Sequence, residues 1–140
     1  MNLLRIENFL ESLGGRLLVS FVLAAVITLP GWSGWKVYGD DATALLIPQL
    51  AFYKNALTEG SNPFWNPYVA VGFPNFVSII HPYAPTVWLV RLLSPVLAHY
   101  VGLLIILTLT LFFSVSFLRR LGISIWGSWI GGLSYLMAAS

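Results

Sequence analysis

The stretch Leu92–Leu118, LLSPVLAHYVGLLIILTLTLFFSVSFL, decides the class of this protein. It runs for 27 residues without Asp, Glu, Lys or Arg, and the pair Arg119-Arg120 follows it directly. Ser94-Pro95 is typical of a helix start, because serine caps free N–H groups and proline suits the first helical turn. The helix that remains is long enough to cross the roughly 30 Å hydrocarbon core of a bilayer with some tilt. We therefore predict a membrane-spanning helix over residues 92–118.

The composition extends this prediction to the whole chain. Of its 140 residues, 58% are hydrophobic and 9% are charged, and the mean hydropathy is +0.83. A soluble domain carries about 25% charged residues, so this chain has too few to cover a surface in water. The net charge of +2 is too small and too scattered for a nucleic-acid-binding surface. The absence of cysteine excludes disulfides, thiolate zinc sites and cysteine nucleophiles.

Two further uncharged stretches predict membrane helices. Residues 17–35 form the first predicted span. A signal peptide has a similar apolar core, but no small-x-small cleavage site follows this core directly. The sequence therefore favours an uncleaved helix. Residues 121–140 form the third span, and the sequence stops there as though truncated. Small residues recur at every fourth position along it, either because they let helices approach closely in lipid or because they are common in membrane helices. The residues concerned are Ser124, Ser128 and Gly132 on one row and Gly127 and Gly131 on another.

The basic residues predict how the chain is oriented. Arg5 and Arg16 lie in the N-terminal segment 1–16, and residues 119–120 form the turn between the second and third spans. Placing both segments on the cytoplasmic side satisfies the positive-inside rule. The N-terminus is then cytoplasmic, and residues 36–91 form an extracytoplasmic loop. The expected fold is an all-α membrane protein with about three transmembrane helices and this long first loop.

Within the loop, residues 42–58 predict an amphipathic helix. Its apolar stripe consists of Leu46, Leu50, Tyr53 and Leu57. Pro48 divides the segment into a short turn and a longer helix, and Gly60 supplies a left-handed cap at its end. Segment 69–90 is uncharged but rich in proline, which is unsuited to an exposed span. We expect it to form a loop or partial helix in the membrane interface.

The loop also carries the candidate catalytic residues, Asp40 and Asp41. Two adjacent carboxylates repel each other, so one of them is expected to have a raised pKa and to be the better base near neutral pH. The alternative is that one carboxylate caps the following helix and the other is solvated. Further along, the aromatic, proline-bracketed segment 62–68 either offers a surface for stacking on sugars or buries its rings at the lipid interface.

The order of these motifs is definite. They are Gly39-Asp40-Asp41, Gln49, Gly60, Pro63-Phe64-Trp65-Asn66-Pro67-Tyr68, Gly72-Phe73-Pro74, Pro82-Tyr83, Arg119-Arg120-Leu121-Gly122 and Gly131-Gly132-Leu133-Ser134-Tyr135. This order resembles the amino-terminal part of YfhO-type bacterial membrane proteins, which are similar to the wider GT-C superfamily of multi-pass glycosyltransferases. The resemblance covers about Leu17 to Ser140.

The resemblance implies a multi-pass protein of the bacterial inner membrane that transfers a sugar from a polyprenyl-phosphate donor to a cell-envelope acceptor at the outer face. Asp40 or Asp41 would remove the acceptor's proton or position the acceptor, and a divalent metal at this pair is left open for a longer parent protein. The residues expected at the substrate are Gln49, Trp65, Asn66, Tyr68 and His81. Members of the superfamily usually have more membrane helices, so this chain would be a fragment of a larger GT-C-like fold and inactive alone.

A second hypothesis is non-catalytic. In it the chain is a small three-helix membrane subunit whose rows of small residues dock on a larger membrane partner. A nucleotide-sugar donor has no support, because the sequence contains no Gly-rich phosphate-binding loop ending in Lys-Ser or Lys-Thr. The identity of the sugar, the acceptor and the oligomeric state do not follow from the sequence.

Overall fold

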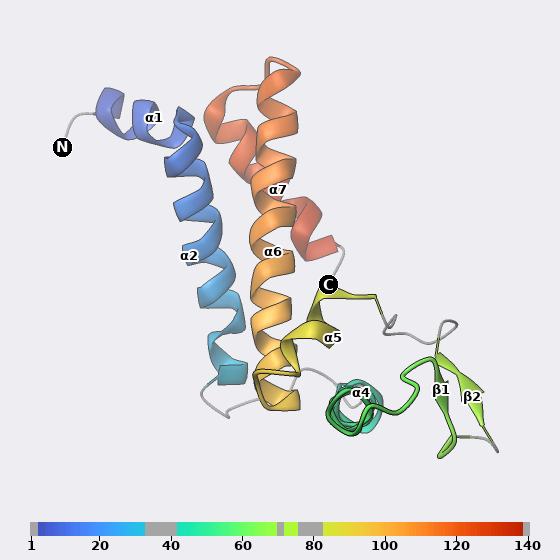
Figure 1. Cartoon of the computed structure of the whole chain (residues 1–140). Helices are drawn as coiled ribbons and strands as arrows, with labels where there is room; N and C mark the ends of the chain where they lie inside the picture. The colour runs from blue at the N-terminus through green and yellow to red at the C-terminus, as the bar shows by residue number, and fades with distance from the viewer. Residues whose placement is uncertain (1–2, 33–41, 70–71, 76–82, 139–140) are drawn as a thin grey trace. The chain divides into compact units, whose positions relative to one another are not determined.

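The computed structural model describes residues 3–32, 42–69, 72–75 and 83–138, and these are mostly helical (Figure 1). In chain order the elements are α1 (Leu3–Glu11), α2 (Leu13–Trp32), the π-helical turn η1 (Ala42–Leu46), α4 (Ile47–Glu59), β1 (Trp65–Asn66), β2 (Phe73–Pro74), α5 (Pro85–Leu89), α6 (Pro95–Arg120) and α7 (Ile125–Ala138). The chain divides into two compact units. One consists of Met1–Leu29 with Leu103–Ser140, and the other of Pro30–Gly102.

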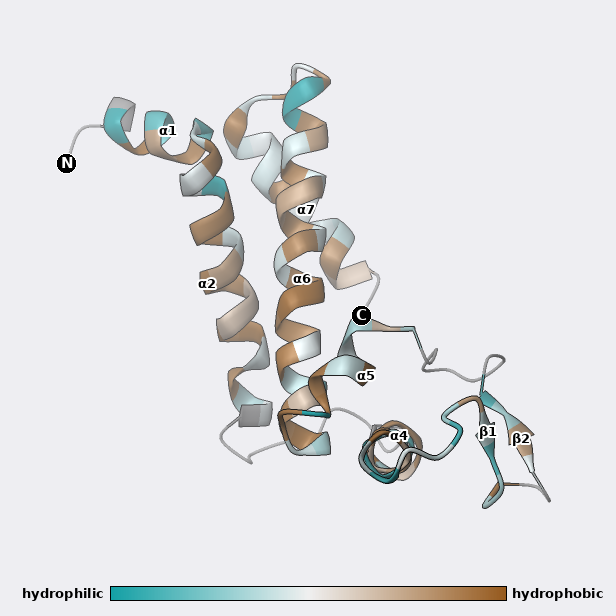
Figure 2. Cartoon of the chain, viewed as in Figure 1, coloured by the Kyte–Doolittle hydropathy of each residue, from teal (hydrophilic) through white to brown (hydrophobic). Residues whose placement is uncertain are grey.

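Helices α2 and α6 have the length and composition of membrane spans. Leu13–Gly31 and Pro95–Arg120 have mean hydropathies of 1.9 and 2.5, and 22% of the most apolar window in each is buried inside the described structure. The core helix of a soluble protein is mostly buried, so the low burial of these two helices suggests a place in a membrane. Figure 2 shows apolar residues along most of both helices. These helices coincide with the first two predicted spans, although α2 begins at Leu13 and therefore includes Arg16.

Helix α7 is shorter than the predicted third span. It has 14 residues, which extend about 21 Å at 1.5 Å per residue, whereas the hydrocarbon core is roughly 30 Å thick. The reason is the turn before it, where Gly122 has φ 82° and the Ile123 N–H donates to the Leu118 carbonyl. The described residues therefore contain two candidate spans where the sequence predicted three.

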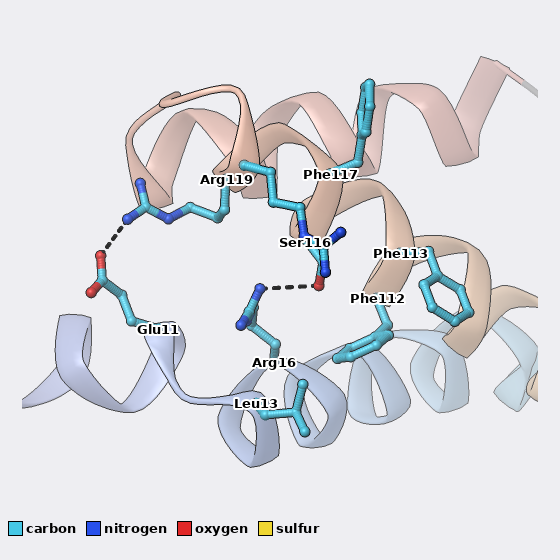
Figure 3. Close-up of a pocket in the computed structure, with 9 residues that line it drawn as sticks. Glu11, Leu13, Arg16, Phe112, Phe113, Ser116, Phe117 and Arg119 are labelled. Carbon is cyan, nitrogen blue, oxygen red and sulfur yellow. Dashed lines mark hydrogen bonds and ion pairs between the residues drawn. The ribbon is translucent and has the colours of Figure 1, made fainter.

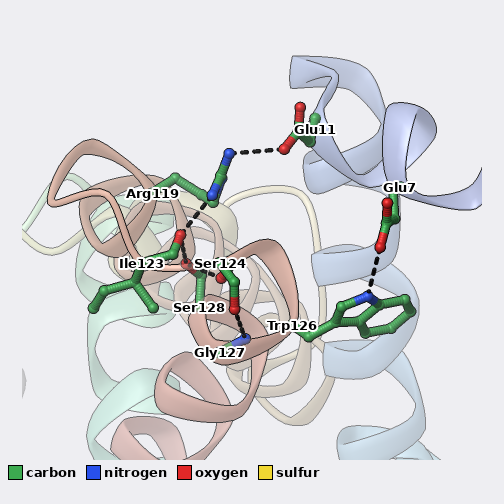
Figure 4. A network of polar contacts seen from close by, with 8 residues as sticks. All are labelled: Glu7, Glu11, Arg119, Ile123, Ser124, Trp126, Gly127 and Ser128. Carbon is green, nitrogen blue, oxygen red and sulfur yellow. Dashed lines mark hydrogen bonds and ion pairs between the residues drawn. The ribbon is translucent and has the colours of Figure 1, made fainter. Parts of the chain in front are cut away.

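In the unit of Met1–Leu29 with Leu103–Ser140, α1, α6 and α7 share an apolar core. Its buried members are Leu10, Leu111, Val115, Ile125 and Trp129. Polar contacts hold α1 in place (Figure 4): Trp126 Nε1 donates to Glu7 Oε1 at 3.1 Å, and Arg119 Nη2 pairs with Glu11 Oε1 at 2.7 Å. Helix α1 was not predicted within segment 1–16, and it is ordered by these partners from the far end of the sequence.

Small residues let α7 approach α6 closely. A Cβ on Gly132 would lie 2.9 Å from Val115 Cγ2 and 3.1 Å from Leu111 Cδ1, and one on Gly131 would lie 2.9 Å from Leu118 Cδ1. Ser128, on the same row as Gly132, is fully buried. At these positions the rows of small residues face another helix of the same chain, which is their usual role between membrane helices.

The Gly132 contact predicts a specific loss of stability. Gly132→Leu should destabilise the protein by about 1–3 kcal/mol, because its side chain enters space that Val115 and Leu111 already fill. The matched control is Gly14→Leu, since a Cβ there meets no atom within 4 Å and the change should be near neutral. Unfolding of both variants in mixed micelles, followed by circular dichroism, measures the difference. Equal midpoints for the two would mean that α7 does not approach α6 at Gly132.

In the unit Pro30–Gly102, α4 packs on α5 and on the first turns of α6. The buried residues are Leu50, Tyr53, Val87, Val90 and Ala98. The predicted stripe on residues 42–58 therefore packs against protein at its centre, and Lys54 Nζ reinforces this contact by donating to the Leu93 carbonyl at 3.0 Å. Three local predictions are confirmed: Pro48 stands in the first turn of α4, Gly60 has φ 70°, and Ser94 Oγ caps α6 by accepting from the Leu97 N–H.

The fold is mostly helical, as predicted, but it contains one short strand pair that the prediction did not include. Strands β1 and β2 form an antiparallel pair in which Trp65 lies opposite Pro74 and Asn66 opposite Phe73. A two-residue strand is too short to show an alternating pattern, so the sequence contained no strand signal. Pro74 has no N–H and is tolerated because the pair consists only of edge strands. Of the predicted interfacial segment 69–90, the described part contains β2 and α5, and residues 70–71 and 76–82 lie outside the described residues.

Candidate functional site

A pocket of about 450 Å³ lies within the unit Pro30–Gly102, lined by residues of η1, of α4 and of the segments 66–69 and 73–75. Three side-chain amides and three aromatic rings line it, together with aliphatic residues and a proline. The amides belong to Gln49, Asn66 and Asn75, and the rings to Phe52, Tyr68 and Phe73.

Asn66 and Asn75 are fixed by hydrogen bonds to the backbone. Asn66, 6% exposed, accepts the Tyr68 N–H at 3.0 Å through Oδ1, which leaves its amide N–H groups for other partners. Asn75, 1% exposed, donates from Nδ2 to the Pro63 carbonyl at 2.7 Å, and its backbone N–H donates to the Phe64 carbonyl at 2.9 Å. These bonds hold both side chains in a defined orientation at the pocket wall.

Gln49 is held by Tyr53, a residue of its own helix, α4. Gln49 Nε2 donates to Tyr53 Oη at 3.4 Å, one helical turn further along α4. Burial raises the pKa of the Tyr53 hydroxyl, and the hydrogen bond from Gln49 lowers it to a smaller extent. Tyr53 is therefore neutral throughout the physiological pH range and keeps Gln49 in place at the pocket wall.

The aromatic residues form a partly exposed wall. The rings of Phe52 and Tyr68 meet edge to face, with centroids 6.4 Å apart and an interplanar angle of 72°. Tyr68 is 87% exposed, so most of its ring is open at the rim of the pocket. Trp65 lies in the hairpin next to the pocket, and a Cβ on Gly72 would overlap its ring. Only glycine satisfies both this close approach and the φ of 110° at position 72.

The structure brings together part of the predicted site. Gln49, Asn66 and Tyr68 line the same pocket, whereas Trp65 supports the hairpin beside it. The remaining predicted site residues, His81, Asp40 and Asp41, lie outside the described residues. Among the residues that are described, no three His, Cys, Asp or Glu side chains come together as metal ligands would.

Phe52, Phe73 and Asn75 are pocket residues that the sequence reasoning missed. Phe52 had a usable signal, because it follows Gln49 by three residues and so lies on the same face of a helix. Phe73 and Asn75 had none beyond their position in the Gly72-Phe73-Pro74-Asn75 motif, since their approach to α4 depends on the hairpin.

Comparison with protein-family models, curated proteins and solved structures finds no match for this chain. The architecture defines a mostly helical protein with two candidate membrane spans. The similarity to YfhO-type proteins stays a prediction from the order of the motifs.

The contact between Gly72 and Trp65 predicts how the hairpin responds to mutation. Gly72→Ala should accelerate chymotrypsin cleavage within residues 61–75 at least tenfold, which corresponds to about 1.4 kcal/mol of local stability. Trp65→Ala removes the overlap with the ring but keeps the backbone strain, so Gly72→Ala should cost less in that background. If the cost is the same in both backgrounds, Trp65 does not pack on Gly72.

Proposed function

We propose that this chain is part of a membrane glycosyltransferase-like protein and that the pocket beside α4 binds a sugar. The observation that carries the proposal is the joint lining by the amides of Gln49, Asn66 and Asn75 and the rings of Phe52, Tyr68 and Phe73. An amide both donates and accepts hydrogen bonds, which matches the hydroxyl groups of a sugar. An aromatic ring offers a flat apolar surface for the C–H face of a sugar.

The size and charge of the pocket support a neutral ligand. Its volume of about 450 Å³ lies within the range of roughly 300–1,000 Å³ typical of small-molecule sites. None of the described residues that line it is charged, and a phosphate would call for Arg or Lys instead. We therefore assign the pocket to the sugar itself, with the phosphate of the donor held elsewhere in the protein.

The proposed reaction moves a sugar from a polyprenyl phosphate to a cell-envelope acceptor at the outer face of the bacterial inner membrane. Asp40 or Asp41 acts as the general base that takes the acceptor's hydroxyl proton while the sugar leaves its phosphate. Two observations support this assignment: the motif order resembles YfhO-type proteins, and Asp41 directly precedes η1, whose Ala44 and Leu45 line the pocket. A divalent metal at the Asp pair belongs to this proposal only for a longer parent protein.

The proposed topology keeps the N-terminus in the cytoplasm, with α2 and α6 as the two spans. The apolar surfaces of α2 and α6 support a location in lipid, where a polyprenyl chain would also lie. The alternative, a small docking subunit, is less well supported, because Gly131 and Gly132 already face α6 within the chain.

The sugar assignment predicts that substitutions at Tyr68 and Gln49 weaken sugar binding and that a substitution at Tyr83 does not. In nanodiscs, Tyr68→Ala should weaken binding of prenyl-phosphate hexoses about fivefold, and Gln49→Ala should have a similar effect, because each removes one stacking or hydrogen-bonding partner. Tyr83→Ala is the matched control, since Tyr83 is also exposed but does not line the pocket. Isothermal titration with farnesyl-phosphate glucose, mannose and galactose measures the effect.

The Asp variants distinguish transfer from binding when a transfer assay is added to the titration. Asp40→Asn or Asp41→Asn should leave hexose binding unchanged while abolishing transfer in the parent protein. Unchanged binding in both Tyr68→Ala and Gln49→Ala would contradict the sugar pocket, and unchanged transfer in both Asp variants would contradict the proposed base.

A further inference from the structure

A second pocket, of about 720 Å³, lies within the unit of Met1–Leu29 with Leu103–Ser140. The end of α1, the start of α2 and the last turns of α6 line it (Figure 3). Its polar residues are Glu11, Arg16, Ser116, Arg119 and Arg120. The pocket thus gathers three arginines and a single carboxylate, where one candidate span begins and the other ends.

The carboxylate neutralises only one of these arginines. Glu11 Oε1 pairs with Arg119 Nη2 at 2.7 Å, and Arg119 also donates to the Ile123 carbonyl. The other carboxylate of α1, that of Glu7, accepts from the indole of Trp126. Among the described residues, neither Arg16 nor Arg120 has a carboxylate partner. The pocket therefore keeps an excess of positive charge.

Arg16 is the most constrained of the three. Its Nη1 donates to Ser116 Oγ at 3.0 Å, which aims the guanidinium from α2 toward α6 (Figure 3). Its Nε is buried and has no hydrogen-bond partner in the described structure. A buried guanidinium N–H without an acceptor is costly, and an anion with several oxygen atoms would satisfy it.

The rest of the lining is apolar. Leu13, Phe113 and Phe117 are 67%, 62% and 60% exposed, and all three lie at this pocket. Exposed phenylalanines beside unpaired arginines suit an amphiphile better than a free ion, because one end of the ligand is charged and the other is apolar. The two candidate spans place lipid molecules within reach.

We propose that this pocket binds the phosphate of an anionic membrane phospholipid. Arg16 and Arg120 contact the phosphate oxygens, and the acyl chains lie along Phe113 and Phe117. Ser116 positions Arg16 through its hydroxyl group. This site is independent of the proposed sugar pocket, which belongs to the other unit.

Native mass spectrometry of the whole protein in detergent tests the site by counting bound lipids. Phosphatidylglycerol should bind at least tenfold more tightly than zwitterionic phosphatidylcholine, and Arg16→Gln should abolish that preference. Arg120→Gln should reduce it as well, and because Arg120 is exposed this second variant keeps the test valid if Arg16→Gln fails to fold. Arg5→Gln is the matched control, since Arg5 is an exposed arginine of the same unit outside the pocket.

Three results would overturn the proposal. Equal affinity for the two lipids, or an equal loss of preference in Arg5→Gln, would mean that binding reflects general surface charge. Inorganic phosphate that displaces phosphatidylglycerol at equal concentration would show an anion site that makes no use of the lipid, and the lipid assignment would fail. Preference for phosphatidylglycerol that depends on Arg16 and Arg120 but resists phosphate supports it.

Discussion

We infer that lipid covers the apolar surface of α2 and α6, and the placement of polar groups in the rest of the structure depends on it. Most of that surface is not covered by the chain's own described residues: in the most apolar window of each helix, 22% is buried. Within these helices the backbone polar groups bond to one another, as they must where water is absent. The charged and amide side chains that can recognise ligands are therefore concentrated outside the most apolar stretches, in the loop 36–91 and around the ends of the helices.

The two pockets use this limited polar chemistry in different ways. The pocket beside α4 has amides and aromatic rings without charge, which suits hydroxyl groups and the flat face of a sugar. The pocket lined by Arg16 and Arg120 has unpaired cations beside exposed phenylalanines, which suits an anionic amphiphile.

Helices and helix ends that depend on residues close in the sequence were predictable. Elements that depend on contacts between residues far apart in the sequence were not. The gaps between charges predicted α2 and α6, and the local chemistry of Gly60 and Ser94-Pro95 predicted helix ends. Helix α1 was missed because Leu10 gains its apolar partners from α6 and α7. The sequence named Gln49 and Asn66 as site residues. That they line one pocket depends on the hairpin of β1 and β2, whose pairing could not be read from the sequence.

The most direct test of the lipid-covered helices uses the natural absence of cysteine from the chain. Single cysteines at Ser61, Ser12 and Ile106 would be treated with a water-soluble maleimide in membranes opened on both sides. Ile106 lies in α6 and is 55% exposed in the structure, so water would let it react as Ser61 and Ser12 do. We expect labelling at Ser61 and Ser12 and none at Ile106 until the membrane is dissolved and the protein denatured. Labelling of Ile106 in intact bilayers at the rate of Ser61 would contradict the account.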